Sequence, residues 1–199
     1  MTFPTRLDDE TAGKEARNAP DVIEKALFDA RVVMLTGEVN DAQARRVTER
    51  LFALASQNAS PITFVISSPG GHVESGDMIH DVIKFIHAPV RMLGTGWVAS
   101  AGALIYCAAQ RENRYCLPNT RFLLHEPRGG VAGMASDVEI QAREILRMRE
   151  RLNRIFAEAT GQPVDKIKRD VDRDYWMMAE EAKAYGLVGK IVRSQNEVR

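Results

Sequence analysis

The chain has 199 residues, 45% of them hydrophobic, and its 27 Lys and Arg residues balance 27 Asp and Glu residues to a formal net charge of zero. This length suits one domain with a substantial core, and the balanced charge argues against nucleic acid and an anionic membrane as partners. The sequence contains neither an apolar run of bilayer-spanning length nor a signal-peptide pattern at its start, so we expect a cytoplasmic protein.

The cysteines and histidines show no metal-binding pattern. Cys107 and Cys116 lie in apolar surroundings and form neither a CxxC motif nor a cluster with histidines. They are typical of reduced, buried thiols in a cytosolic protein, which makes a zinc site improbable. His80 and His87 fall on one predicted helix without an HExxH-like spacing, so we interpret them as structural.

The first 21 residues are polar and of mixed charge, and two prolines, Pro4 and Pro20, interrupt regular structure. This composition predicts a mobile N-terminal arm at residues 1–21, with a docking role and no role as equal alternatives. Residues 22–199 form the single domain that we expect.

From Ala30 onward, strand patterns alternate with amphipathic helix patterns. Strands are predicted at 31–37, 62–66 and 90–93, and a helix follows each of them. The first helix is opened by Asn40 or Asp41 as its cap. Three strand-helix units in succession predict a largely parallel sheet with crossover helices, and therefore an α/β fold.

A serine, Ser100, stands between the third strand and the third helix, which runs from Ala101 to Ala109. The first amides of a helix have no intrahelical partner and carry partial positive charge. A serine at this place therefore either caps the helix or acts as a nucleophile beside ready-made oxyanion donors. Taken alone, the residue favours the cap.

The turn after the second strand ends in two glycines, Gly70 and Gly71, followed by His72. Two glycines let the backbone approach a ligand closely and aim its amides at an oxyanion. Without a nucleophile nearby, the same sequence is only a turn. His72 either lines the same cleft or is a solvated turn residue.

Short strands are predicted at 114–117 and 121–124, and the second of them runs into His125. A histidine where a buried strand opens into a loop is well placed for general-base catalysis, although a lone histidine is more often a satisfied core residue. A short helix at 165–170 leads to an acidic turn in which Asp172 or Asp174 is available to orient His125. Acidic turns are usually only solvated.

The longest helix pattern runs from Asp137 to about Ala159 and follows a glycine-rich segment at 129–133. Its apolar residues recur at helical spacing on one face. We expect a helix of this length in a small α/β domain to project from it and to build oligomer contacts. A helix at 180–185 and a strand at 187–192 complete the domain.

Five motifs occur in a specific order between residues 25 and 192. They are Ser68-Pro69-Gly70-Gly71, the segment 96–103, Leu117-Pro118-Asn119 with Arg121 and His125-Glu126-Pro127, the helix segment 137–146, and Arg169-Asp170 with Arg173-Asp174. Together they resemble the family of ClpP, the proteolytic subunit of the ATP-dependent Clp protease. Each motif alone is weak, but five in order and at the expected separations are highly specific.

The resemblance implies a crotonase/ClpP-like ββα superhelix with a protruding handle helix at about residues 129–159. It also implies an ATP-dependent serine endopeptidase core that hydrolyses unfolded polypeptides inside a double-ring chamber. In these terms Ser100 is the nucleophile, His125 the base and Asp174 the carboxylate that holds the imidazole, while Gly71 and Ala101 supply the oxyanion amides. The chain order Ser, His, Asp differs from those of α/β-hydrolases, chymotrypsin and subtilisin.

The partners implied by the resemblance are further copies, in two stacked heptameric rings, and a hexameric AAA+ Clp unfoldase. ATP is used by the unfoldase, so no cofactor or metal is expected in this subunit. Two features depart from the family: the arm at 1–21 is polar, and Thr63 and Val65 stand where tyrosines often line the docking pocket. We therefore expect altered docking, and a divergent second paralogue that enters mixed rings is one interpretation. Glu126 replaces a common glutamine.

Two alternative functions remain open. One is a non-catalytic or regulatory ring subunit of a mixed Clp complex, against which the intact Ser100, His125 and Asp174 argue. The other is a crotonase-superfamily acyl-CoA enzyme, which would share the fold and the oxyanion pair but would not need Ser100 and His125 together.

Overall fold

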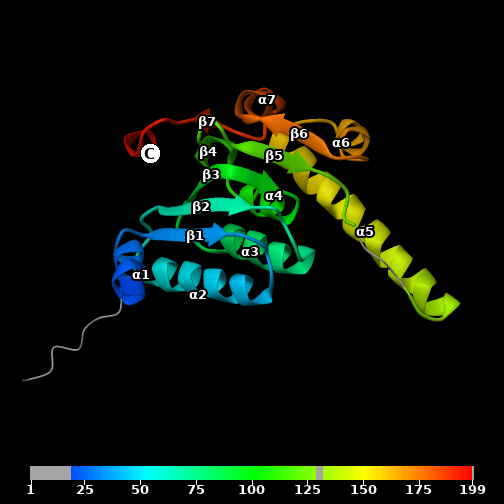
Figure 1. Cartoon of the computed structure of the whole chain (residues 1–199), viewed down its shortest axis with the longest axis horizontal. Coiled ribbons are helices and arrows are strands. Elements are labelled where there is room, and N and C mark those ends of the chain that lie inside the picture. Colours follow the sequence, from blue (N-terminus) through cyan, green and yellow to red (C-terminus); the bar gives the residue numbers. More distant parts are fainter. Residues whose placement is uncertain (1–18, 129–131, 199) are drawn as a thin grey trace, which may run out of the picture.

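The computed structural model describes residues 19–128 and 132–198 (Figure 1). Most of the arm predicted at residues 1–21 lies outside this part of the chain, but residues 19–21 belong to a helix, α1 (Ala19–Asp29), that the sequence pattern does not predict. From the sequence, Pro20 predicts an interruption of regular structure. A proline is nevertheless tolerated in the first turn of a helix, because its missing N–H is not needed there.

The strands of the described chain form one mixed sheet. Its members are β1 (Val32–Thr36), β2 (Ile62–Ser68), β3 (Val90–Ala99), β4 (Arg114–Cys116), β5 (Arg121–Leu124), β6 (Tyr175–Met178) and β7 (Lys190–Ile191). The order β1-β2-β3-β4-β7 is parallel throughout, and β5 pairs parallel with β3 and antiparallel with β6. The α/β prediction is confirmed, whereas β6 is a strand that the sequence pattern missed.

β3 belongs to two branches of the sheet. Its residues Met92–Gly94 pair with β4 and its residues Trp97–Ala99 pair with β5. Between them Gly96 has φ +59, and a Cβ there would lie 2.8 Å from Ser67 Oγ. The strand predicted at 90–93 is therefore longer than expected, because glycines bend a strand without ending it.

Helices connect the strands and cover one face of the sheet. They are α2 (Asp41–Gln57), α3 (Val73–Phe85), α4 (Ala101–Tyr106), α5 (Ala135–Thr160), α6 (Val164–Asp170) and α7 (Ala179–Tyr185), with short 3₁₀ helices at Arg111–Asn113 and Gln195–Glu197. Asn40 rather than Asp41 caps α2, since its side chain accepts a hydrogen bond from Gln43 N at 3.0 Å. None of the helices in the described ranges has both the length and the apolar character that a membrane span requires.

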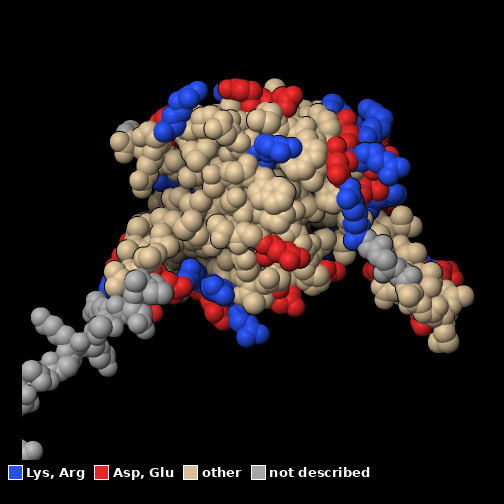
Figure 2. Space-filling model, in the orientation of Figure 1, with Lys and Arg blue, Asp and Glu red and all other residues tan. Residues whose placement is uncertain are grey.

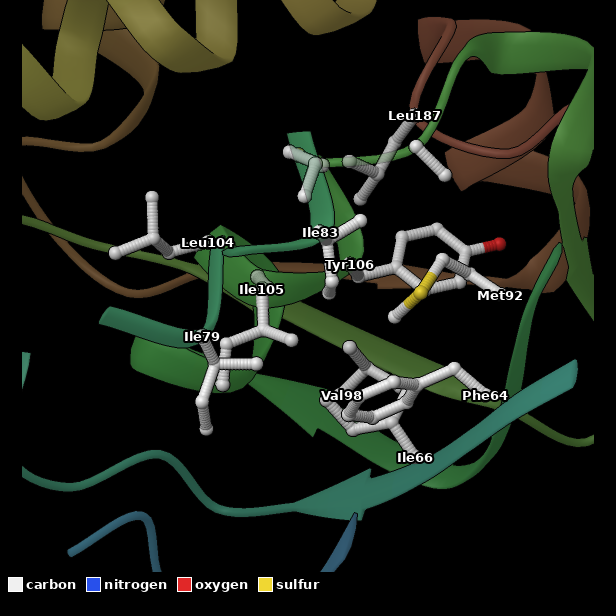
Figure 3. Packing of buried hydrophobic residues seen from close by; sticks show 14 of the residues in the cluster. Phe64, Ile66, Ile79, Ile83, Met92, Val98, Leu104, Ile105, Tyr106 and Leu187 are labelled. Atoms are coloured by element: carbon white, nitrogen blue, oxygen red, sulfur yellow. The ribbon is translucent and has the colours of Figure 1, made fainter. Parts of the chain in front are cut away.

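The core lies between the sheet and helices α3 and α4. Figure 3 shows Phe64 and Ile66 of β2 and Val98 of β3 in one cluster with Ile79 of α3 and Ile105 of α4, and all five side chains are fully buried. Each such side chain stabilises the fold by about 1.5–3 kcal/mol. This packing fixes the carboxyl ends of β2 and β3, from which the site is built.

α5 projects from the body of the domain (Figure 1). Its buried residues lie in its last nine positions, from Leu152 to Thr160, and the rest of the helix leaves Ile140 and Leu146 exposed by 55% and 50%. The predicted projection is thereby confirmed. Uncovered apolar side chains on a projecting helix are typical of a contact surface.

Candidate active site

The sheet brings the predicted site residues to one edge. Gly70 and Gly71 follow β2, Ser100 follows β3 and His125 follows β5. Because these strands are parallel, their carboxyl ends meet at the same edge, which is where open α/β sheets bind ligands.

The register of β5 and β6 brings the predicted carboxylate to the same edge. Leu124 pairs with Tyr175 in the antiparallel direction. The residue after β5, His125, therefore lies opposite the residue before β6, which is Asp174. The other candidate, Asp172, instead has its carboxylate 3.8 Å from Arg173 Nε.

Ser100 has an unusual backbone conformation, with φ 55 and ψ −122. It stands at the N-cap position of α4, but its side chain makes no capping hydrogen bond. Its amide donates to Leu123 O at 2.9 Å, which fixes it against β5. A positive φ in a non-glycine residue costs about 1–3 kcal/mol and is concentrated at functional sites. The helix-cap interpretation of Ser100 is therefore wrong.

Two backbone amides are available beside Ser100. Ala101 begins α4, so its N–H has no intrahelical acceptor. At Gly71, Val39 N donates to Gly70 O and His72 N donates to Val39 O, each at 2.8 Å, whereas no backbone hydrogen bond in the described ranges uses the Gly71 amide. A Cβ on Gly71 would lie 2.2 Å from Val39 O, so this turn requires glycine. Both amides are suited to an oxyanion.

Gly70 lies directly against Ser100, a position that the sequence alone did not assign to it. A Cβ at this position would lie 2.6 Å from Ser100 Cβ and 2.9 Å from Ala99 O. The Gly70 amide donates to Ser68 Oγ at 3.1 Å, which holds the turn in place. The signal in the sequence was the pair of glycines. In the structure Gly70 allows the close approach to Ser100, and Gly71 supplies the amide without a backbone acceptor.

His125 and Asp174 are adjacent but not hydrogen-bonded. His125 Nδ1 lies 3.8 Å from Asp174 Oδ1, and the exposed fractions of the two side chains are 13% and 42%. Nδ1 is buried without a hydrogen-bond partner. The loop that carries the histidine is tied down by Glu126 N, which donates to Val171 O at 3.0 Å.

The carboxylate of Asp174, which faces His125, is paired with the guanidinium of Arg128. Arg128 Nη2 donates to Asp174 Oδ1, the same oxygen to which His125 Nδ1 is nearest. Burial lowers the pKa of His125, the positive charge of Arg128 lowers it further, and the charge of Asp174 raises it. Arg128 is not predicted as a site residue from the sequence, where its only signal is its position three residues after His125.

A second group of the same three residue types lies elsewhere in the fold. Ser75 Oγ donates to Asp41 Oδ1 at 2.5 Å, and His72 Nδ1 lies 2.8 Å from Ser75 Oγ. His72 Nε2 lies 3.1 Å from Glu74 Oε2. His72 is thus engaged at the start of α3, and Ser75 is only 3% exposed.

The two cysteines are buried thiols with raised pKa values, which makes them unreactive. Both are free and buried. Burial is the main cause that raises the pKa of Cys107 to about 11 and that of Cys116 to about 12, so both thiols stay protonated at neutral pH. Within residues 19–128 and 132–198, no group of three or more His, Cys, Asp or Glu side chains is arranged to hold a metal ion.

Comparisons with known proteins place this geometry in a family context. A family model described as Clp protease matches residues 14–195. The ATP-dependent Clp protease proteolytic subunit 2 of Gluconobacter oxydans is 56% identical, with 98% of this chain and 93% of the relative covered. The ATP-dependent Clp protease proteolytic subunit 3 of Rhizobium meliloti is 62% identical, with 88% and 90% covered.

Solved structures are similar over the same region. ClpP1 from Listeria monocytogenes is 48% identical, has a TM-score of 0.81, and covers 89% of this chain and 99% of its own. A point mutant of ClpP1 from the same organism gives a TM-score of 0.83 at 49% identity, with the same coverage. These likenesses confirm the ClpP-like fold.

Proposed function

The chain belongs to the Clp protease family and is a serine endopeptidase of that family, and we propose that Ser100, His125 and Asp174 carry its reaction. The observation that carries this assignment is Ser100 itself. Its strained backbone presents a hydroxyl that caps no helix, next to the first amide of α4 and against the turn Gly70-Gly71. Strained backbone is concentrated at functional sites, and a serine hydroxyl at the edge where three parallel strands end suits nucleophilic catalysis.

The reaction proceeds by acyl transfer. His125 accepts the Ser100 proton at Nε2 while Oγ attacks the peptide carbonyl, because Nδ1 faces Asp174. The amides of Gly71 and Ala101 donate to the oxyanion of the tetrahedral intermediate, a contribution worth about 10²–10³ in rate for each donor. His125 then protonates the leaving amine, and water releases the acyl group from Ser100.

Assembly into two stacked heptameric rings, alone or mixed with a second ClpP paralogue, is supported by surfaces that the subunit leaves uncovered. One is the exposed part of α5, within the handle proposed at about residues 129–159. The other is the sheet face that the helices do not cover. Figure 2 shows that the middle of the face turned to the viewer carries few charged side chains. Met34, Trp97 and Trp176 on strands of the sheet are 42%, 44% and 38% exposed.

A hexameric AAA+ Clp unfoldase is the partner that would deliver polypeptide, and it would consume the ATP, so this subunit needs no cofactor. A cavity of about 870 Å³ on the domain supports a docking site. It is lined by Thr63, Val65 and Leu93 together with residues of α1 and the C-terminal segment. With Thr63 and Val65 in place of tyrosines, we expect weak use of the standard unfoldase, and tight nucleotide-dependent binding in a pulldown would contradict this.

We place the protein in the cytoplasm. The two free, buried thiols support this location, because reducing compartments keep such cysteines unpaired.

One observation favours a second candidate, a regulatory ring subunit without activity of its own. The distance of 3.8 Å between His125 Nδ1 and Asp174 Oδ1 leaves the triad open. The intact Ser100 and its oxyanion amides favour the active subunit, since a purely structural ring component has no need of a strained serine.

The test is labelling with a serine-reactive fluorophosphonate, followed by intact mass and native mass measurements. The wild type and Ser75→Ala should each gain one adduct in a particle many times the subunit mass, while Ser100→Ala gains none. No adduct on the wild type would move the regulatory subunit to first place, and an adduct on Ser100→Ala would remove the proposed mechanism.

A further inference from the structure

We propose that Arg128 is a positioning residue that withdraws Asp174 from His125, so that the triad closes only when Arg128 releases the carboxylate. The inference rests on the roles proposed for Ser100, His125 and Asp174, and it adds a residue that acts on the reaction through Asp174 without contacting substrate.

Arg128 and His125 compete for one oxygen atom of Asp174. Arg128 Nη2 donates to Asp174 Oδ1, and the same Oδ1 is the atom nearest to His125 Nδ1. At 3.8 Å this second distance is too long for a hydrogen bond, and a shift of about 1 Å would bring it into range. The carboxylate therefore sits within reach of both groups and is bound to Arg128.

The pairing of Asp174 with Arg128 leaves a buried nitrogen of His125 without a hydrogen-bond acceptor. His125 Nδ1 is shielded from solvent and has no hydrogen-bond partner in the described part of the chain. Buried ring nitrogens are normally satisfied, and an orphaned one requires an explanation. The engagement of Asp174 by Arg128 supplies it, since the carboxylate that would accept from Nδ1 is held elsewhere.

The ion pair between Arg128 and Asp174 is exposed and therefore weak. Arg128 is 69% exposed and Asp174 is 42% exposed, whereas His125 is 13% exposed. Exposed ion pairs contribute little to stability, so this one is readily broken by a new partner for the guanidinium or by the binding of substrate. A hydrogen bond from His125 on the sheltered side is favoured once Arg128 leaves.

The charged groups that act on His125 are Arg128 and Asp174. Arg128 lowers the pKa of the imidazole and Asp174 raises it. Release of Asp174 from Arg128 thus strengthens the base in two ways: the unfavourable positive charge moves away and the favourable negative charge moves closer.

The experiment compares Arg128→Gln with Arg46→Gln, which removes the same charge from an exposed position on α2. We expect Arg128→Gln to raise kcat/KM for a fluorogenic peptide, and the rate of fluorophosphonate labelling of Ser100, by about two- to fivefold, the size that one exposed ion pair allows. Arg46→Gln should leave both unchanged. Arg128→Ala provides a second variant with the same expected direction.

Two further readouts separate positioning from a merely structural role. Arg128→Gln should move the acid limb of the kcat/KM profile to higher pH, because the pKa of His125 rises when the guanidinium is removed. In an Asp174→Asn background, the same substitution should give a clearly smaller gain in labelling rate, since there is no carboxylate to release and only the loss of the positive charge still acts on His125.

Three results would overturn the proposal: an unchanged or lower rate in Arg128→Gln, a gain of the same size with Asn at position 174, or a gain that comes with a changed native mass. These differ from failure of the proposed mechanism, which would be labelling or hydrolysis that survives Ser100→Ala.

Discussion

Two clusters in the described part of the chain combine a serine, a histidine and an aspartate, and they differ in what the serine hydroxyl contacts. In the cluster at the start of α3, Ser75 lies within a helix, is 3% exposed and donates its hydrogen to Asp41. In the cluster at the sheet edge, Ser100 has φ 55 and is partly exposed beside the turn Gly70-Gly71. Residue types alone do not distinguish them.

The difference lies in where the backbone aims each hydroxyl and what surrounds it. Ser75 Oγ is satisfied by groups of its own cluster, with His72 Nδ1 2.8 Å away, so it has no direction left for a substrate. Ser100 makes no side-chain cap bond and is followed directly by the first amide of α4, which has no intrahelical acceptor. A hydroxyl and amides without partners in the fold are free to bind a substrate, which is why we propose Ser100 rather than Ser75 as the nucleophile.

The largest effect expected from this comparison is on catalysis. Ser100→Ala should lower peptidase kcat by at least about 10⁴-fold, because the nucleophile is lost. Ser75→Ala should leave kcat within about twofold of the wild type and cost about 1 kcal/mol of stability through its lost hydrogen bonds. Steady-state kinetics and denaturant unfolding of both variants check this, and a collapse of activity in Ser75→Ala would reverse the assignment.

The next largest effect concerns Gly70, the glycine that lies against Ser100. Gly70→Ala should lower kcat by about 100-fold, because a Cβ 2.6 Å from Ser100 Cβ must displace it. Gly161→Ala is the matched control, since φ is +73 there but nothing lies within 4 Å of the added Cβ. It should cost about 1 kcal/mol of unfolding free energy and leave kcat unchanged. Equal activities in the two variants would contradict the close approach.

A smaller effect follows from pH. Burial and Arg128 lower the pKa of His125, so the neutral base should persist below the ordinary titration range near 6.5, and activity should extend to correspondingly lower pH. The same lowered pKa makes the folded state less stable as the pH falls. Between the folded and the ordinary pKa the unfolded chain binds more protons, so the unfolding free energy falls as pH falls through that window.

His125→Asn is the control for the pH effect. It should remove this contribution to the pH dependence of stability, measured by denaturant unfolding at several pH values. An unchanged slope in His125→Asn would show that other groups dominate the window.

The smallest effect concerns salt. The Arg128–Asp174 pair is exposed, so raising the ionic strength to about 0.5 M should weaken it and speed fluorophosphonate labelling of the wild type by at most about twofold. Arg128→Gln should show no such acceleration. A larger acceleration in the variant than in the wild type would mean that salt acts elsewhere.

The sequence by itself determined the strand-helix units and the residues at their junctions. Periodic apolar residues predict β1 to β3 and their helices because a strand or helix buries one face wherever it lies. Ser100, His125 and Asp174 were reached by a family resemblance, and the structure brings all three to one edge. Residue patterns alone left Ser100 between cap and nucleophile, and left Asp172 and Asp174 equal.

Features that depend on partners distant in sequence follow only from the tertiary structure. The pairing of Leu124 with Tyr175 makes 175–178 a strand and brings Asp174, rather than Asp172, opposite His125. Contact with Ser100 distinguishes Gly70 from Gly71, and only the folded chain places Arg128 on Asp174. Local propensity cannot encode these choices, because each depends on which segments the folded sheet makes neighbours.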